Sequence, residues 1–307
     1  MKKLKFNWQK LGLLFKPEKD TCWMVSHTGS AAVLHNTGDI FDFYITGRDS
    51  KNRSSIGKAV LDLSKIPKIT SFQKKPILSK GRLGTFDENG VSYPSLVKLK
   101  NEIYLYYTGW LPTKITPFQN QLGLAIIKGN EIKRYSRAPI LDRNRDDYIS
   151  IGSAFVMKEG KNWKMWYTSF LEWEESQKNQ LKHKYLIKYA TSNDGLHWMR
   201  KNHIAINFRH PLEHAICRPS VIKLNNIYHM FFCSKGYNYK LGYAFSADGV
   251  NWTRDDNNIG LKLSKNGWDS KEMCYPHVFK HKNHLYILYA GNNYGDSGVG
   301  LAKMKIE

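Results

Sequence analysis

Short apolar runs alternate along this chain with polar gaps that contain Gly, Pro, Asn or Asp, and paired runs recur in a fixed order. The first run of a pair begins with Pro-Ser or a related dipeptide, and the second is rich in aromatic residues and ends in Gly or Ser. Such pairs occupy residues 30–47, 94–109, 153–169, 219–234 and 276–291, and they start about 60 residues apart. Self-similarity at such an interval predicts a repeat architecture.

Each repeat is predicted to be a unit of four β-strands. The paired runs supply two strands, because they are short, β-branched or aromatic, and bounded by turn residues. A third run with small residues follows, as in residues 122–126 and 241–245, and small side chains suit close packing between sheets. In two repeats a Ser-x-Asp-Gly-x-x-Trp segment, residues 192–198 and 246–252, predicts a hairpin turn into a fourth, outer strand. Four-stranded units repeated radially predict an all-β, five-bladed β-propeller with antiparallel blades.

The N-terminal segment is predicted to complete the last blade. The fifth repeat ends after its third strand, at residues 304–306, whereas residues 6–15 resemble the outer strand of another repeat. An unpaired edge would be open to pairing with other chains, so we expect the N-terminal strand to pair with residues 299–306. The sequence thus predicts a single propeller domain over residues 1–307.

Composition fits a globular protein, and charge suggests an anionic partner. Hydrophobic residues make up 41% of the chain, and no stretch approaches the roughly 20 apolar residues of a membrane span. The basic N-terminus lacks the apolar run and cleavage site of a signal peptide, so we expect a cytoplasmic protein. A net charge of +21 predicts attraction to an anionic sugar, a nucleotide sugar or an anionic membrane surface, or else reflects a lysine-rich surface. No nucleic-acid-binding fingerprint accompanies this charge. The 4 cysteines lack metal-ligand spacing, and we expect no metal and no cofactor.

Candidate binding residues stand just before each first strand or just after each second strand. In a propeller the innermost strands line the axis, so these positions converge on a central funnel. Aromatic rings beside Arg and carboxylates suit a sugar, because ring faces stack on apolar sugar faces while polar groups bind hydroxyls. The candidate substrate-binding residues are Arg218, Arg48, Trp110, Trp173, Tyr93, Tyr275, His277, Lys235 and Asn292.

The pattern of Tyr-Pro-Ser or Arg-Pro-Ser starts, Tyr-Tyr or Trp-Tyr second strands and Asp-Gly-x-x-Trp hairpins resembles the five-bladed propeller glycoside hydrolases of families 43, 32/68 and 130. The resemblance extends over essentially the whole chain, and it is closest to glycosylase-like propellers of surface-polysaccharide gene clusters. It implies a carbohydrate-active enzyme that cleaves or forms glycosidic bonds. In those hydrolases an Asp stands at the start of the first blade, a second Asp on a following blade, and an acid Glu on the third or fourth.

The chain departs from that pattern at the first blade, where residues 26–30 contain no carboxylate. Glu213 matches the position of the acid, Asp87 or Glu88 is a candidate second carboxylate, Glu272 is a candidate substitute, and His27 stands where the hydrolases carry Asp. Because hydrolysis needs two carboxylates beside the scissile bond, three alternatives remain open: hydrolysis, glycosyl transfer in polysaccharide or glycoconjugate synthesis, and non-catalytic carbohydrate binding or scaffolding. A funnel with only aromatic residues and Arg favours binding or transfer.

Overall fold

The computed structural model describes residues 4–175 and 181–306 and consists almost entirely of β-structure. Its strands form three four-stranded sheets and one eight-stranded sheet, and paired strands are antiparallel except where β12 meets β14. Helical structure in this part of the chain is limited to a 3-10 turn, Asp256–Asn258, and to α1 (Asn292–Gly295). Neither of these helices is long enough to cross a bilayer.

For reference, we number the groups of four strands as units in chain order. Unit one contains β2 (Ala31–Thr37), β3 (Ile40–Arg48), β4 (Ser54–Asp62) and β5 (Lys68–Phe72). Unit two contains β6 (Val91–Lys98), β7 (Ile103–Leu111), β8 (Gln119–Lys128) and β9 (Glu131–Arg134). Unit five contains β18 (Cys274–His281), β19 (His284–Ala290), β20 (Val299–Lys305) and, from the N-terminus, β1 (Gln9–Phe15).

The eight-stranded sheet holds units three and four. Unit three contains β10 (Ile151–Glu159), β11 (Asn162–Glu175), β12 (Leu181–Ser192) and β13 (Met199–Ile206). Unit four contains β14 (Ala215–Leu224), β15 (Ile227–Lys235), β16 (Tyr239–Ser246) and β17 (Thr253–Arg254). The two groups are joined through one parallel pair, Tyr185 with Ala215.

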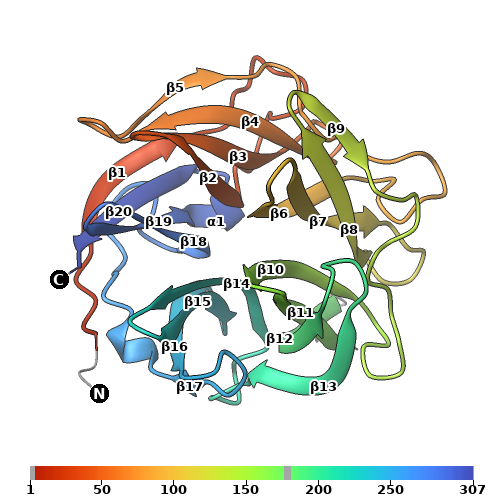
Figure 1. Ribbon diagram of the computed structural model, residues 1–307. Coiled ribbons are helices and arrows are strands. Elements are labelled where there is room, and N and C mark those ends of the chain that lie inside the picture. The colour runs from red at the N-terminus through yellow and green to blue at the C-terminus, as the bar shows by residue number, and fades with distance from the viewer. Residues whose placement is uncertain (1–3, 176–180, 307) are drawn as a thin grey trace.

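The first strands of the units face a common centre (Figure 1). Strand β2 contacts β6 and β18, β10 contacts β6 and β14, and β14 contacts β18. The Pro-Ser motif contributes to these contacts through its polar residue. Ser95 Oγ accepts a hydrogen bond from the Val156 backbone N–H at 3.0 Å, and Ser220 Oγ accepts one from Val278 at 2.9 Å. The motif therefore links the first strand of one unit to that of the next.

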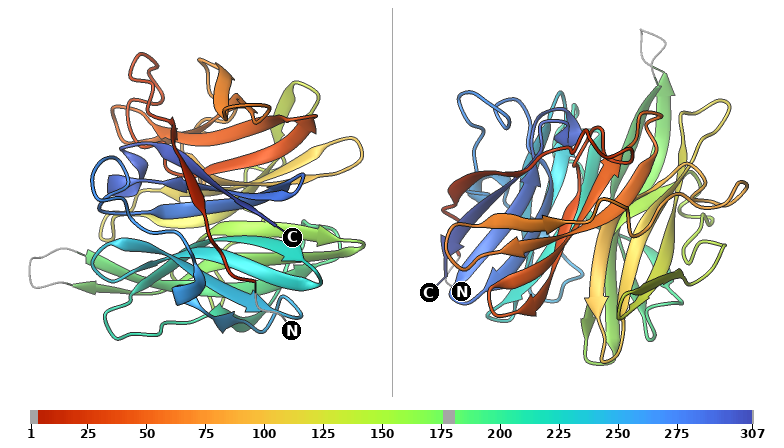
Figure 2. Two further views of the ribbon diagram at one scale, coloured as in Figure 1. Left: turned by 90° about the vertical axis from the view of Figure 1, so that its left-hand side faces the viewer. Right: turned by 90° about the horizontal axis from the view of Figure 1, so that it is seen from above.

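The predicted pairing of the N-terminal segment is observed. Strand β1 runs antiparallel to β20, with Gln9 opposite Lys303 and Phe15 opposite Val299, and Figure 2 shows the two terminal strands side by side. The segment before β1 is also anchored, because Trp8 is buried in an apolar core cluster and its Nε1 donates to the Ile259 carbonyl at 2.9 Å. The N-terminus thus covers the outer edge of β20.

Small residues in the third strands allow the close packing that the sequence predicts. A Cβ atom added to Gly57 would lie 2.2 Å from the Trp23 ring, and one added to Gly300 would lie 2.1 Å from the Trp268 ring. Such distances are far shorter than van der Waals contact. A side chain at either position would therefore push an aromatic ring out of the packed interior.

Candidate functional site

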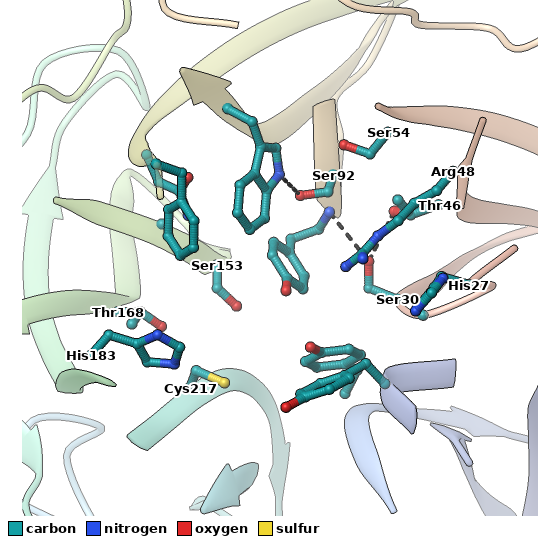
Figure 3. Close-up of a pocket in the computed structure, with 18 of the residues that line it drawn as sticks. His27, Ser30, Thr46, Arg48, Ser54, Ser92, Ser153, Thr168, His183 and Cys217 are labelled. Carbon is teal, nitrogen blue, oxygen red and sulfur yellow. Dashed lines mark hydrogen bonds between the residues drawn. The ribbon is translucent and has the colours of Figure 1, made fainter. Parts of the chain in front are cut away.

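A cavity of about 390 Å³ opens where the first strands meet. Residues from all five units line it, so the cavity belongs to the arrangement of the whole chain rather than to one sheet (Figure 3). Its size is within the range of pockets that bind small ligands. The lining residues are His27, Gly29, Ser30, Thr46, Arg48, Asn52, Ser54, Asn89, Ser92, Tyr93, Trp110, Pro117, Phe118, Asn120, Gly152, Ser153, Thr168, Phe170, His183, Tyr185, Cys217, Tyr239, Tyr275 and Tyr294.

Backbone strain recurs at the same place in four first strands. Tyr93, Ser153, Arg218 and Tyr275 have φ values of 55°, 50°, 52° and 54°, although none of them is Gly. Each lies within a register shift between the first and second strands of its unit. Bulges of this kind redirect side chains, and non-glycine residues with positive φ are concentrated at functional sites. Here three of the four residues line the cavity and Arg218 does not.

Aromatic rings and hydroxyl groups make up much of the cavity wall. The Trp110 ring lies edge-on to Phe118 with centroids 4.8 Å apart, and Tyr93 lies edge-on to Tyr275 at 5.4 Å. Trp110 is fixed by a hydrogen bond from its Nε1 to Ser92 Oγ at 2.6 Å. Among the described residues that line the cavity there is no Asp or Glu. The wall can therefore stack against a ligand and exchange hydrogen bonds with it, but it does not supply a carboxylate pair.

Nitrogen-containing side chains enter the cavity from two sides. Figure 3 shows Arg48 and His27 on one side and His183 on the other. Burial, followed by the charge of Arg48, lowers the pKa of His27 below its usual 6.5. Burial, followed by electrostatic repulsion from His214 and Lys235, lowers the pKa of His183 to about 4. Both lining histidines are therefore neutral at pH 7, when they can donate and accept hydrogen bonds.

The structure brings five of the sequence-predicted residues together around the cavity. These are His27, Arg48, Tyr93, Trp110 and Tyr275. They come from the starts of first strands or the ends of second strands, as the repeat pattern predicts. Their convergence is consistent with a shared ligand.

Other predicted binding residues lie behind or beside the wall. Trp173 packs against Phe118, with ring centroids 5.3 Å apart, and does not line the cavity. Lys235 Nζ donates to the Tyr294 hydroxyl at 2.6 Å, so it stands behind a lining residue. Asn292 Oδ1 accepts hydrogen bonds from the backbone N–H groups of residues 271 and 272. Two of these three positions are thus engaged in fixing the wall rather than exposed to the cavity.

His277 and Arg218 are also placed outside the lining. His277 occupies the Ser position of the Pro-Ser motif, and its Nε2 accepts a hydrogen bond from the Val33 backbone N–H at 3.1 Å. Burial, then the charge of Arg218, lowers the pKa of His277 to about 3, which keeps this nitrogen available as an acceptor. In this structure His277 links two first strands and does not line the cavity.

Arg218 is 1% exposed and lies close to Tyr93, with its guanidinium carbon 5.9 Å from the ring centroid. Its Nη2 donates to the carbonyl oxygens of Ala31 and Pro94. Burial lowers its pKa to about 10, so it remains cationic at neutral pH. Nε and Nη1 have no hydrogen-bond partner in the part of the chain that the structure describes. Arg218 therefore joins first strands while placing a positive charge next to the cavity wall.

In three units a carboxylate in the loop before the first strand makes the same pair of contacts. Asp87 Oδ2 accepts hydrogen bonds from Tyr107 Oη at 3.1 Å and from Arg134 Nε at 2.8 Å. Asp147 Oδ2 accepts hydrogen bonds in the same way from Tyr167 and Arg200, and Asp269 Oδ2 accepts them from Tyr289 and Lys10. In each case the Tyr comes from the second strand, and the base comes from the outer strand of the same unit. We call these three residues the loop carboxylates.

Glu213 makes the corresponding contact in unit four. Arg254, on the outer strand β17, donates from both terminal nitrogens to Glu213, each at 2.9 Å. Burial alone would raise the pKa of Glu213, but the hydrogen bonds from Arg254 and from the Arg209 backbone outweigh it and lower the pKa. Such a carboxyl stays ionised, which is unfavourable for a proton donor. Glu88 is also outside the cavity lining, and its Oε2 accepts from the Gly84 backbone N–H.

Asp87, Glu88 and Glu213 are thus not brought together around the cavity, contrary to the expected convergence. The physical reason is that a loop before an inner strand can also turn outward, toward the basic residue of the outer strand. A buried carboxylate that is paired and hydrogen-bonded in this way stabilises the unit without facing a ligand.

Glu272 differs from the other predicted carboxylates. It is 7% exposed, and its Oε1 has no hydrogen-bond partner within residues 4–175 and 181–306. Burial raises its pKa above the usual 4.5, against the opposing charge of Lys235. It does not line the cavity, although Tyr275, three residues further along the chain, and Tyr294, whose backbone contacts its side chain, do. Of the predicted carboxylates, Glu272 is the one whose environment favours a protonated acid.

Sequence reasoning missed several lining residues at the starts of third strands. Tyr185 lies within β12 and Tyr239 is the first residue of β16. Their hydroxyl groups hydrogen-bond to each other. Cys217 also lines the cavity, and its Sγ lies 3.8 Å from the Tyr239 hydroxyl. In units three and four, the available signal was a Tyr two residues before the small-residue third strand, Tyr185 before Ile187 and Tyr239 before Leu241. No group of three or more His, Cys, Asp or Glu in the described residues is arranged to bind a metal ion.

Comparison of the sequence with known proteins places the chain in a family. No family model matches it. It is 37% identical over 299 residues to the uncharacterized protein Rv1502 of Mycobacterium tuberculosis (strain ATCC 25618 / H37Rv), covering 97% of this chain and 99% of that protein. The uncharacterized protein MT1551 of strain CDC 1551 / Oshkosh matches over the same share at the same identity. The chain belongs to the Rv1502 family. The match spans nearly the full length of both proteins.

Solved structures similar to this Rv1502 family member are propeller glycoside hydrolases. A member of the GH130 family of mannoside phosphorylases has a TM-score of 0.74 at 15% identity, covering 99% of this chain and 95% of that one. A thermostable family-43 glycoside hydrolase has a TM-score of 0.68 at 17% identity, covering 95% and 92%. A putative glycoside hydrolase from Parabacteroides distasonis has a TM-score of 0.70 at 14% identity, covering 98% and 96%. The predicted resemblance is therefore confirmed for the fold.

Proposed function

We propose that the central cavity binds a carbohydrate, and that the five units are the blades of a single five-bladed propeller domain. The cycle of contacts among first strands and the single parallel pair between units three and four support the blade count. The observation that carries the binding proposal is the lining itself, which combines aromatic rings, hydroxyl groups and Arg48 with no Asp or Glu among the described residues. Rings stack on sugar faces, and hydroxyl and imidazole groups bind sugar hydroxyls.

The lining argues against hydrolysis by a pair of carboxylates. That mechanism needs one carboxyl group on each side of the scissile bond. The loop carboxylates and Glu213 are instead paired with bases of the outer strands. Carbohydrate binding, alone or as part of a glycosyl transfer, therefore agrees with the geometry better than two-carboxylate hydrolysis does. A role in polysaccharide synthesis in the cytoplasm remains part of this proposal, supported by the basic chain.

Removing the Trp110 ring is expected to weaken sugar binding at least tenfold, because the ring is a large, rigid stacking surface in the wall. The measurement is the dissociation constant of Trp110→Ala for a sugar that wild type binds, obtained by calorimetry or saturation-transfer NMR. Tyr135→Ala serves as the control, since Tyr135 is 48% exposed and lies outside the cavity. Equal affinities for wild type and Trp110→Ala would contradict the proposal.

A second candidate function, catalysis with one acid group, is favoured by Glu272. Its raised pKa and unpartnered oxygen suit a residue that donates a proton to a leaving oxygen. In that case Glu272→Gln is expected to lower the turnover number at least a hundredfold for any glycoside or sugar donor that wild type converts. The dissociation constant for the same substrate is expected to change little. A variant with full turnover would remove Glu272 from this role, and retained binding would leave the first proposal in place.

A further inference from the structure

Arg48 stands out among the cavity-lining residues because its charge is not neutralised by a neighbouring carboxylate. Its Nη1 donates to the Asn52 side-chain oxygen at 3.1 Å, which is a neutral partner. The nearest carboxylate in sequence, Asp49, is engaged by Arg53, whose Nε donates to Asp49 Oδ2 at 2.8 Å. No ion pair is found for Arg48 in residues 4–175 and 181–306. Figure 3 shows the Arg48 side chain directed into the cavity.

The cationic groups around the cavity outweigh the anionic ones. Arg218 lies beneath Tyr93 as a buried cation, and Lys235 lies behind Tyr294 at 2.6 Å from its hydroxyl. Besides Asp49, which Arg53 engages, two acidic groups near the wall are Asp296, which is half exposed and 4.0 Å from His27, and Glu272, whose pKa is raised. Neither of them lines the cavity. The cavity therefore presents a positive potential to whatever enters it.

We infer that the cavity selects a sugar that carries an acidic group, a carboxylate or a phosphoester, and that the Arg48 guanidinium binds this group. The inference rests on the proposed function, and it adds the class of ligand and the residue that determines specificity. A guanidinium offers two parallel N–H donors to the two oxygens of such a group. An unpaired cation in a partly desolvated cavity is unfavourable, and an anionic ligand removes that cost. The aromatic wall meanwhile contacts the sugar ring.

Matched pairs of neutral and acidic sugars test the inference on the full chain. The pairs are glucose with glucuronic acid, galactose with galacturonic acid, and mannose and N-acetylglucosamine with their 1-phosphates, and inorganic phosphate is measured alone. We expect the acidic member of at least one pair to bind at least tenfold more tightly than its neutral partner. Preference in the uronic-acid pairs identifies a carboxylate, and preference in the phosphate pairs identifies a phosphoester.

The Arg48→Gln variant is expected to lose about tenfold to a hundredfold in affinity for the preferred acidic sugar and little for its neutral partner. Arg137→Gln removes the same charge from an exposed site outside the cavity and controls for net charge. Arg48→Lys keeps the charge but not the paired donors, and is expected to recover part of the affinity. Melting temperatures close to wild type would show that the variants are folded.

Three results would overturn the inference, and they are distinguishable. Equal affinity for neutral and acidic members would remove the acidic-group requirement while leaving the proposed carbohydrate binding intact. Inorganic phosphate that binds as tightly as the sugar phosphates would show an anion site without sugar recognition. Failure of every neutral and acidic sugar to bind would overturn both the inference and the proposed function.

Discussion

Replacing Asp147 with Asn is expected to lower the free energy of unfolding by about 3–5 kcal/mol, because the change removes one partner of a buried ion pair and leaves the other charge buried. Asp147 is 1% exposed and accepts hydrogen bonds from Ser169 at 2.6 Å and from Lys188 at 2.9 Å. Lys188 is itself 2% exposed, so its charge would be left buried without a counter-ion. The measurement is the midpoint and slope of urea unfolding for both proteins.

Asp146→Asn is the matched control, because it makes the same change one residue earlier. The Asp146 carboxylate is 3.9 Å from Arg145, whose side chain is 96% exposed, and such surface pairs contribute at most about 1 kcal/mol. The Lys188 contact to Asp146 involves the backbone carbonyl and would remain. Equal losses in the two variants would contradict a specific structural role for Asp147.

The same contact predicts how stability responds to acid. Burial raises the pKa of Asp147, but hydrogen bonds from Ser169 and Lys188 outweigh it and hold the pKa below the ordinary 3.8. The folded state therefore binds fewer protons there than the unfolded state, and the stabilisation is present above pH 3.8 and is lost as the pH falls toward the folded pKa. Wild type is expected to lose stability over this range more steeply than Asp147→Asn, as measured by urea midpoints at a series of pH values.

Deleting residues 1–16 is expected to lower the melting temperature by at least about 10 °C or to abolish cooperative unfolding. The deletion removes β1 from β20 and takes Phe6, Trp8 and Phe15 out of the core, each of which contributes roughly 2–3 kcal/mol by burial. It also removes Lys10, which pairs with Asp269 at 2.6 Å. An unpaired β20 edge would favour association as well.

Leu13→Ala provides the control for the truncation. Leu13 is on the same strand but is 43% exposed, so its substitution is expected to cost about 1 kcal/mol or less. Calorimetry or circular dichroism would measure both proteins. A truncated chain that melts within 2–3 °C of wild type, roughly the effect of 1 kcal/mol, would show that β1 does not stabilise unit five.

The repeated pattern of the sequence was sufficient to predict the four-stranded units and five of the residues that line the cavity. Pro-Ser starts, Tyr-rich second strands and small-residue third strands each correspond to an observed contact, such as the bond from Val156 to Ser95. Tyr93, Trp110 and Arg48 could be placed at the centre because position within a repeat determines distance from the axis. These predictions depended on the repeated order of apolar, aromatic and turn residues, which can be identified in a single sequence.

The direction of loop side chains could not be predicted in the same way. Asp87 and Glu213 precede inner strands, and their partners Arg134 and Arg254 are 47 and 41 residues further along the chain. Only the folded structure shows that these bases form ion pairs with Asp87 and Glu213. One relation was nevertheless present in the sequence: Asp87, Asp147 and Asp269 each precede by 20 residues the Tyr that donates to them. Recurrence at a fixed spacing indicates a structural contact more than a catalytic one.

The dissociation constant of one sugar, measured on Trp110→Ala and Glu213→Gln, tests the account most directly. The ligand is any sugar that wild type binds, and the melting temperature of each variant is recorded alongside. Trp110→Ala is expected to bind at least tenfold more weakly while remaining folded, whereas Glu213→Gln is expected to keep the wild-type dissociation constant but to melt at a lower temperature. The reverse pattern, with binding lost in Glu213→Gln and kept in Trp110→Ala, would contradict it.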